Sequence, residues 1–294
     1  MRISIQSVLY GNDPRHIHRT SESVFTAARH ASANAGVTSW EYRIGDCSPS
    51  PALGDEDLAT LRESALEHGG EFSYEHFGAN LGSAAGHNRL ASSGTSDHIV
   101  FLNPDARVAP DCFVALIGSL RTSVGLVEAR QIPLDHPKEY EEYTGDTSWA
   151  STACALTTRQ LFESVEGFDS QTFFLYGDDV DYSWRVRLAG YRVVFEPGAR
   201  VFHDKRLSID GGWLVTPAEQ YYSAEASLML AHKYSNPSRV QFLLTEFTSS
   251  RVAALERAAR TYRDREANGG LPQPIDPDHV VARFVGDVYA EHRF

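Results

Sequence analysis

Cysteine is scarce in this sequence, and its spacing argues against two kinds of stabilising site. The 294 residues include three cysteines, Cys47, Cys112 and Cys154. An odd number at wide intervals fits neither a disulfide framework nor a zinc site. The sequence is therefore expected to work in a reducing compartment, and the cytoplasm is the predicted location.

Long apolar runs are also missing. No uninterrupted hydrophobic stretch approaches the roughly 20 residues that a membrane-spanning helix needs. The first residues, Met1 to Val8, alternate between apolar and polar side chains, which predicts a strand rather than a signal peptide. We expect at most a peripheral contact with the inner face of a membrane.

Basic residues are outnumbered by acidic ones. Lys and Arg total 27 against 39 Asp and Glu, so the formal net charge is −12 and the pI is about 5.4. Nonspecific binding of nucleic acid needs a basic surface, and so does a purely electrostatic hold on anionic lipid. The composition argues against both. An anionic substrate would instead be met by a bound metal or by a few placed Arg and His side chains.

What the sequence does contain is a regular alternation of strand and helix patterns. Strands are expected at 3–10, 39–44, 71–76 and 98–102, and helices at 18–35, 55–68, 80–93 and 110–120. This order predicts an α/β fold with a mostly parallel sheet and helices on both faces. Ligands of such sheets bind beyond the carboxyl ends of the strands. Tyr10, Asp46 and Asp105 fall at such ends.

The pattern changes in the second half of the chain. Short strands are expected at 125–130, 152–158 and 191–195, and a helix at 180–189. After Pro217, apolar residues recur at helical spacing, which predicts a helical extension over residues 216–294 behind an α/β domain over residues 1–215. The apolar stripe of the extension needs a partner. It could pack on the α/β domain, join two copies of the chain or dock a lipid-linked substrate.

Two polar positions at strand ends are candidate metal ligands. Asn103-Pro104-Asp105 follows a buried strand, and a carboxylate on a stiff turn is well placed to hold Mg²⁺ or Mn²⁺. The alternative is an ordinary turn, in which Asp is favoured anyway. His203 ends a second strand-like run, where imidazole is either a metal ligand or a structural residue.

Three carboxylates crowd the start of the helix near residue 180. Asp178, Asp179 and Asp181 follow the aromatic run Phe173 to Tyr176. Helix capping and the helix dipole account for one or two of these acids. A carboxylate beside an aromatic wall is also a plausible general base for a hydroxyl group.

Taken in order, four segments resemble the family 2 glycosyltransferases. Asn80-Leu81-Gly82 through Gly86-His87-Asn88 resembles the family's NxGxxxGxN stretch, and Leu102 to Asp105 resembles the LNPD form of its metal motif. Gly167 to Arg185 resembles the GFDxxFFLYGEDVDLxWR block, and Leu188 to His203 resembles its LAGYxxxxxPxAxVxH ending. The similarity covers residues 1 to about 205. It is greatest to bacterial rhamnosyltransferases and galactofuranosyltransferases.

The resemblance implies a GT-A fold and an inverting, metal-dependent hexosyltransferase. Its donor-binding half would span about 1–105 and its acceptor-binding half about 106–215. The roles it implies are a general base at Asp179 with Asp178 beside it, and metal ligation by Asp105 and His203. Donor contacts are implied for Tyr10, Asp46, Asn80, Gly82, Asn88 and Asn103, and acceptor contacts for Trp149, Ser151, Thr152, Asp181 and Arg185.

The sequence departs from the family pattern at three places. Asn103 replaces the first acid of the metal motif, which removes one negative charge. Asp46-Cys47-Ser48-Pro49 replaces the usual DNxS, and Asp178-Asp179 replaces Glu-Asp. The first two changes bear on metal affinity and on contacts with the donor base.

The predicted reaction transfers a sugar from a nucleoside diphosphate to a hydroxyl of a glycan or lipid-linked acceptor, as in the synthesis of bacterial surface polysaccharides. The favoured donor is dTDP-rhamnose, followed by a UDP-sugar such as UDP-galactofuranose. Two alternatives remain. A nucleotidyltransferase would use a similar sheet but needs a glycine-rich, basic loop after the first strand, and this sequence has Gly11-Asn12-Asp13-Pro14. A noncatalytic protein that binds sugar nucleotides would tolerate loss of the base.

Overall fold

A computed structural model describes residues 1–136, 139–203 and 215–284. Their centre is an eight-stranded sheet in the order β3-β2-β1-β4-β7-β6-β8-β5. The strands are β1 (Arg2–Leu9), β2 (Ser39–Asp46), β3 (Glu71–His76), β4 (His98–Leu102), β5 (Ala106–Val108), β6 (Val124–Ile132), β7 (Cys154–Thr158) and β8 (Arg192–His203). Four of the neighbouring pairs are parallel, and the pairs β4–β7, β7–β6 and β8–β5 are antiparallel. The predicted mostly parallel sheet is confirmed.

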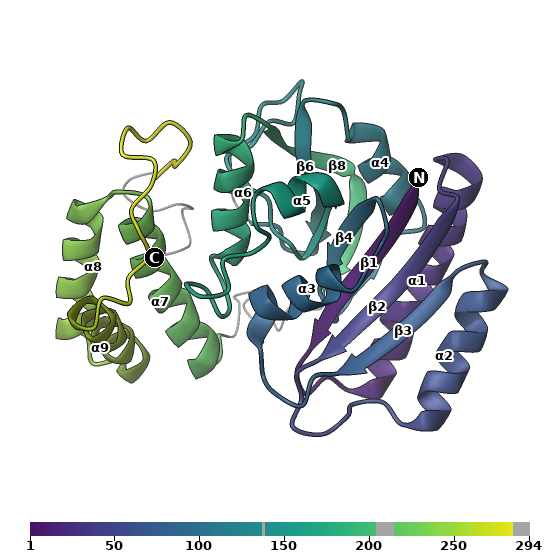
Figure 1. The fold of residues 1–294 in the computed structure, drawn as a ribbon, viewed down its shortest axis with the longest axis horizontal. Coiled ribbons are helices and arrows are strands. Elements are labelled where there is room, and N and C mark those ends of the chain that lie inside the picture. The colour runs from purple at the N-terminus through teal and green to yellow at the C-terminus, as the bar shows by residue number, and fades with distance from the viewer. Residues whose placement is uncertain (137–138, 204–214, 285–294) are drawn as a thin grey trace.

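Helices cover both faces of this sheet (Figure 1). One face carries α1 (Pro14–Asn34), α2 (Asp55–Glu67) and α4 (Cys112–Ser119), whose apolar residues form a single buried cluster with β1 and β2. The other face carries α3 (Gly82–Ser92), α5 (Arg159–Ser164) and α6 (Asp178–Leu188), which enclose a second cluster around Phe101. The sheet is thus buried from both sides, as the predicted α/β layering requires.

Three features differ from the sequence-based expectation. Helix α1 starts at Pro14 rather than His18, because Asp13 caps it by accepting a hydrogen bond from the Arg15 amide at 2.8 Å. Strand β8 continues to His203 past a register shift, and the three-residue β5 pairs with its end. Elements as short as β5 and α5 carry too little periodicity to be predicted.

Between Thr216 and residue 284, the last that the structure describes, the chain forms three helices, α7 (Pro217–Lys233), α8 (Pro237–Ser249) and α9 (Ala253–Ala267). Their apolar faces close over one cluster that also contains Trp149, Phe173 and Trp184 from the α/β part. The predicted apolar stripe is therefore covered within the chain, and the cluster runs across the predicted boundary at residues 215–216. Across the described residues, no helix is both long and apolar enough to cross a membrane.

A buried ion cluster joins α7 to α6. The Lys233 ammonium lies 2.6 Å from Asp181 Oδ1 and 2.7 Å from Asp169 Oδ2, and the Asp181 side chain is fully buried. Arg185 Nε donates to the other Asp181 oxygen at 2.8 Å, and the Tyr234 hydroxyl donates to Oδ1 at 3.0 Å. Buried charges are tolerated only when paired in this way, so the contact fixes the extension against α6.

Replacing Lys233 with Met tests this contact. The change leaves the buried Asp181 and the half-buried Asp169 without their shared cation, and removing one partner of a buried ion pair typically costs about 3–5 kcal/mol. We expect a loss of this size in the free energy of unfolding, measured by urea denaturation. Arg260→Met, on the exposed side of α9, should change stability by less than about 0.5 kcal/mol. Equal stability of the two variants would contradict a stabilising role for the ion cluster.

Candidate active site

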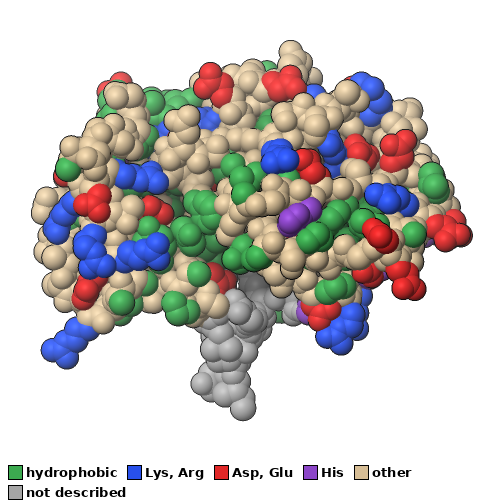
Figure 2. All heavy atoms as spheres, turned by 60° about the horizontal axis from the view of Figure 1, so that its bottom comes forward, with side chains coloured by type: hydrophobic (Ala, Val, Ile, Leu, Met, Phe, Trp, Pro, Cys, Tyr) green, Lys and Arg blue, Asp and Glu red, His purple; other side chains and the backbone are tan. Residues whose placement is uncertain are grey.

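The predicted site residues gather at one edge of the sheet. Strands β1, β2 and β4 are parallel, so Tyr10, Asp46 and Asn103 follow them at the same edge. Strand β8 also ends there, because β7 is antiparallel to both β4 and β6 while β6 and β8 are parallel. Figure 2 looks onto this edge, where hydrophobic side chains gather near the middle of the surface.

Asp105 and His203 are 98 positions apart in the chain but adjacent in space (203 − 105 = 98). The pairing of β5 with β8 sets Ala106 opposite His203. His203 Nε2 then lies 3.2 Å from Asp105 Oδ1 and 3.3 Å from Asn103 Nδ2. The three predicted residues of the metal motif are thus brought together by a strand that the sequence did not predict.

Gln131 orients this histidine. Its Oε1 lies 2.8 Å from His203 Nδ1, and because an amide oxygen only accepts, Nδ1 carries a proton. Nε2 is the ring nitrogen that faces the Asp105 carboxylate and the Asn103 amide, so it is the nitrogen that could bind a cation between them. Sequence reasoning missed Gln131, because a single polar residue near a strand end carries no distinctive signal.

The donor set fits a hard divalent cation in part. One carboxylate oxygen and one imidazole nitrogen are suitable ligands for Mn²⁺ or Mg²⁺. In the described ranges, no group of three or more His, Cys, Asp or Glu side chains is arranged to hold a metal. Two ligands from the protein leave most coordination positions to the substrate, so a diphosphate would complete the site.

Asp46 is fully buried and holds a loop. Its Oδ1 accepts from the Ser48 amide and its Oδ2 from the Ala52 amide, both at 2.8 Å, while the Tyr74 hydroxyl donates to Oδ2. Burial would raise the pKa of Asp46, but these hydrogen bonds outweigh burial and lower it. The carboxylate is therefore ionised and engaged with its own loop, and its contact with a donor base stays a prediction.

The loop that Asp46 anchors in turn fixes the turn after β1. Ser48 Oγ accepts from the Gly11 amide at 2.8 Å, and Gly11 has a φ of +67°, where glycine is favoured. Tyr10, the preceding residue, is 59% exposed. This arrangement leaves the Tyr10 ring accessible at the edge, as a stacking residue requires.

The glycine-rich stretch, Asn80 to Asn88, contacts the segment that precedes the acids of α6 and holds it against α3. Gly82 has a φ of +72°, and a Cβ there would lie 2.2 Å from the Phe174 carbonyl oxygen. The Asn88 amide bonds both ways with the Phe168 backbone, at 2.8 and 2.9 Å. Asn80 accepts from the Gly82 amide at 3.2 Å and is exposed. The contacts of Gly82 and Asn88 are thus with the protein itself, and donor binding by these three residues stays a prediction.

Two residues predicted to contact the substrate, Asp181 and Arg185, contact other parts of the protein. Asp181 has no exposed surface, and its oxygens are bound to Arg185, Lys233 and Tyr234. Arg185 also donates to the Val165 carbonyl. Asp181 is buried and Arg185 is half-buried, and these contacts are with the protein itself, so substrate binding by these two residues stays a prediction. The helical period places Asp181 on the buried side of α6. Sequence reasoning missed this placement because an acidic side chain is normally expected at the surface.

Three further acceptor candidates lie below the surface. Trp149, Ser151 and Thr152 are each less than 9% exposed. Trp149 packs in the cluster shared with the extension, and Ser151 Oγ accepts from the Ala153 amide at 3.2 Å. These contacts are with the protein itself, and a direct contact with an acceptor stays a prediction.

The two adjacent acids at the start of α6 differ in environment. Asp178 is 4% exposed, whereas Asp179 is partly exposed and its Oδ1 accepts from the Val180 amide at 2.9 Å. Burial, and then the charge of Asp179, raise the pKa of Asp178 to about 7, despite a hydrogen bond with Ser83. Within the described part of the chain, Asp178 Oδ2 has no hydrogen-bond partner. Of the two carboxyls, only Asp179 is accessible enough to meet an acceptor hydroxyl.

This difference predicts a pH-dependent effect of Asp178→Asn on stability. Because the folded pKa is raised from 3.8 to about 7, the native state holds a proton that the unfolded state loses, and wild-type stability falls as pH rises through that window. Asn mimics the protonated carboxyl and avoids this loss. The stability of Asp178→Asn relative to wild type should therefore increase between pH 5 and pH 8, by up to about 3 kcal/mol.

Urea denaturation at the two pH values measures this change. Asp264→Asn, at an exposed position of α9, serves as the control and should show a pH-independent difference from wild type. A pH-independent difference for Asp178→Asn as well would mean that Asp178 is ionised at its ordinary pKa.

No protein-family model matches the sequence. Three curated proteins are similar to parts of it. An N-acetylglucosaminyl-diphospho-decaprenol L-rhamnosyltransferase of Mycobacterium tuberculosis is 42% identical over 57 residues, which are 19% of this chain and 18% of that protein. The O-antigen biosynthesis protein RfbC of Myxococcus xanthus is 33% identical over 76 residues, 26% of this chain and 6% of that protein. The pre-mycofactocin glycosyltransferase of M. tuberculosis is 27% identical over 177 residues, 53% of this chain and 37% of that protein. The chain thus spans less than two fifths of the length of these relatives.

Solved structures with the same fold cover nearly all of the chain. Mannosyltransferase PcManGT from Pyrobaculum calidifontis, in complex with GDP-Man and Mn²⁺, has a TM-score of 0.55 at 15% identity, over 91% of this chain and 81% of that one. GalNAc-T7 with UDP, GalNAc and Mn²⁺ has a TM-score of 0.62 at 12% identity, over 91% and 55%. Residues 1–349 of S. aureus TarS have a TM-score of 0.57 at 10% identity, over 92% and 81%. The chain has the GT-A fold, and it resembles the family 2 glycosyltransferases, rhamnosyltransferases among them.

Proposed function

We propose that the protein is a metal-dependent, inverting glycosyltransferase that uses a nucleoside-diphosphate sugar. The observation that carries the proposal is the contact of Asp105 with His203 at the carboxyl edge of the sheet. A partly exposed carboxylate, Asp179, lies at the start of α6, and the segment before it contacts the start of α3 through Phe174 and Ser83. Similarity to a rhamnosyltransferase and to structures solved with nucleotide sugars and Mn²⁺ supports it. A nucleotidyltransferase or a noncatalytic binding protein would not need an accessible base opposite a metal pair.

In the proposed reaction the chain binds the donor, holds the metal and accepts a proton. Tyr10 stacks on the donor base, and the loop held by Asp46 lines the ribose side. Asp105 and His203 would hold a divalent cation, which would supply positive charge to offset the diphosphate leaving group. Asp179 accepts the proton of the acceptor hydroxyl while the oxygen of that hydroxyl forms a bond to the anomeric carbon. The bond from that carbon to the diphosphate breaks on the opposite face, and the configuration inverts.

The donor sugar is the finer part of the proposal. We favour dTDP-rhamnose because a relative that is 42% identical over 57 residues is named a rhamnosyltransferase, and a UDP-sugar such as UDP-galactofuranose is the next candidate. A glycan or a lipid-linked saccharide is the proposed acceptor. Structural neighbours bound to GDP-Man and to UDP share the fold, so the fold does not select the base. Turnover of labelled nucleotide sugars would separate transfer from nucleotidyl transfer and from binding alone.

Replacement of Asp179 by Asn tests the general base. The amide keeps the size of the side chain but cannot accept the proton, and general bases contribute about 10²–10⁴ in rate. We expect kcat to fall at least about a hundredfold, while donor affinity measured by calorimetry stays near wild type. Asp178→Asn is the matched control, because it changes the adjacent acid. If only Asp178→Asn stopped turnover, with both variants folded and binding donor, the roles of the two acids would be exchanged.

Removal of the metal tests the Asp105–His203 pair. Turnover should require Mg²⁺ or Mn²⁺ and disappear in excess EDTA. His203→Ala should raise the Mn²⁺ concentration needed for half-maximal turnover at least about tenfold. Mutating a residue that only hydrogen-bonds a metal ligand already lowers metal affinity by about tenfold or more. His30→Ala, on the exposed side of α1, should leave it unchanged. Full turnover in EDTA would reject a metal-dependent reaction.

A further inference from the structure

A second hollow lies at the opposite end of the sheet from the candidate active site. It has a volume of about 670 Å³, within the range of small-molecule sites. Strand β8 begins at this hollow with Arg192 and, over a length of 12 residues, ends at His203, a span on the order of 30 Å. A ligand in this hollow would therefore not overlap a donor bound near His203.

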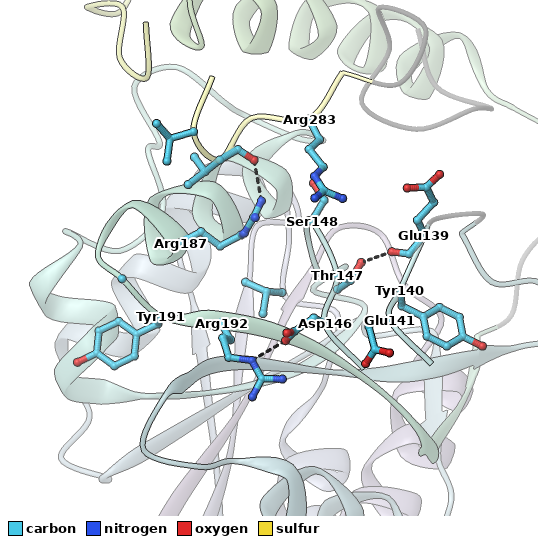
Figure 3. Close-up of a pocket in the computed structure, with 14 residues that line it drawn as sticks. Glu139, Tyr140, Glu141, Asp146, Thr147, Ser148, Arg187, Tyr191, Arg192 and Arg283 are labelled. Carbon is cyan, nitrogen blue, oxygen red and sulfur yellow. Dashed lines mark hydrogen bonds and ion pairs between the residues drawn. The ribbon is translucent and has the colours of Figure 1, made fainter. Parts of the chain in front are cut away.

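Three segments far apart in the sequence form its walls: residues 139–148, the junction of α6 with β8, and residues 280–283 (Figure 3). The last segment is held firmly. The buried Asp276 carboxylate accepts from the amides of Val280, Val281 and Ala282 at 2.7–3.1 Å. Arg187 Nη1 donates to the Val281 carbonyl at 2.6 Å. These bonds give the wall that carries Arg283 a defined conformation.

Three guanidinium groups line the hollow, and they differ in their partners. Arg192 is paired with Asp146 at 2.7 Å. Arg187 and Arg283 come from different segments, and their side chains lie on either side of the hollow near Ser148 (Figure 3). Among the described residues, neither arginine forms an ion pair with a carboxylate at 4.0 Å or less. Burial, and then the positive charge of Arg283, lower the pKa of Arg187, while the negative charges of Asp146 and Asp276 act in the opposite direction. Two like charges held near each other favour an anion between them.

Glu139 and Glu141, two acids that line the hollow, do not supply this anion. Glu141 accepts from the amides of Tyr143 and Thr144 at 3.1 and 2.5 Å, within its own loop. In Figure 3 the Glu139 carboxylate points away from the two arginines. Ser148 Oγ accepts from Trp184 Nε1 at 3.2 Å, which leaves the hydroxyl proton available as a further donor beside Arg283.

We propose that Arg187, Arg283 and Ser148 form a binding site for the phosphate or carboxylate group of an anionic sugar. The guanidinium groups would hold the oxyanion through charge-assisted hydrogen bonds. The remaining volume would take the sugar ring, next to Tyr191, which is 39% exposed. The inference does not depend on the proposed transferase activity, because it uses none of the residues at the active edge.

Calorimetry on the full-length chain in EDTA tests the site without the divalent cation. The probes are inorganic phosphate, glucose 1-phosphate and glucuronate, with glucose as the neutral control. We expect the anions to bind and glucose not to. Arg283→Gln should weaken the binding of glucose 1-phosphate at least about tenfold, since the ligand loses one of two charged donors. Arg260→Gln, an equal change of charge on α9, should leave the affinity within about twofold, because exposed charges far from a ligand are largely screened.

The variants also separate the possible sources of a binding signal. Arg187→Gln should weaken binding as well, and Arg283→Lys, which keeps the charge but loses the planar fork, should fall between wild type and Arg283→Gln. Equal affinity of wild type and Arg283→Gln would overturn the proposal, since any phosphate bound would then lie elsewhere. Absence of binding, or equal binding of glucose, would overturn it too. Transferase turnover, measured separately with Mn²⁺, tests the proposed function independently of these outcomes.

Discussion

The structure depends on a group of four charged side chains between α6 and α7, of which Asp181 and Lys233 are buried and Asp169 and Arg185 are half-buried. Asp169 and Asp181 share the Lys233 ammonium, and Asp181 also binds Arg185. A buried carboxylate without a partner is strongly unfavourable, so these groups must stay together for the chain to remain folded. The segment from Asp169 to the start of α6 is thereby fixed to the extension, and the same segment ends in Asp178 and Asp179.

The acidic segment is held from a second side by α3. The Ser83 amide donates to the Phe174 carbonyl at 3.0 Å, and only glycine fits at position 82, beside that carbonyl. Gly177, which precedes the two acids, adopts a φ of +70° and lies against Ala226 of α7. A side chain at either glycine would push the segment away from a neighbour. The candidate base is therefore positioned jointly by the sheet layer and by the extension, although it belongs to neither core.

The opposite side of the site is built differently. There, β5 and β8 bring Asp105 and His203 together through backbone pairing, and Gln131 sets the ring orientation. The pair is small and carries one formal negative charge, while Asn103 contributes no charge. A site of this kind relies on the substrate for part of its coordination. The same fold occurs in structures solved with GDP-Man and with UDP, so the fold alone does not identify a donor.

The sequence by itself determined the layered α/β architecture and the positions of polar residues at strand ends. Both follow from local periodicity, which repeats every 2 residues in strands and about every 3.6 in helices. Only the tertiary structure decided that Asp181 is internal while Asp179 is accessible, because the packing of α7 sets which side of α6 is covered. The contact of Asp105 with His203 needed β5, a strand too short to have a pattern of its own. The arginine-lined hollow draws on three segments that lie up to 144 positions apart (283 − 139 = 144), and no local pattern encodes a meeting at that separation.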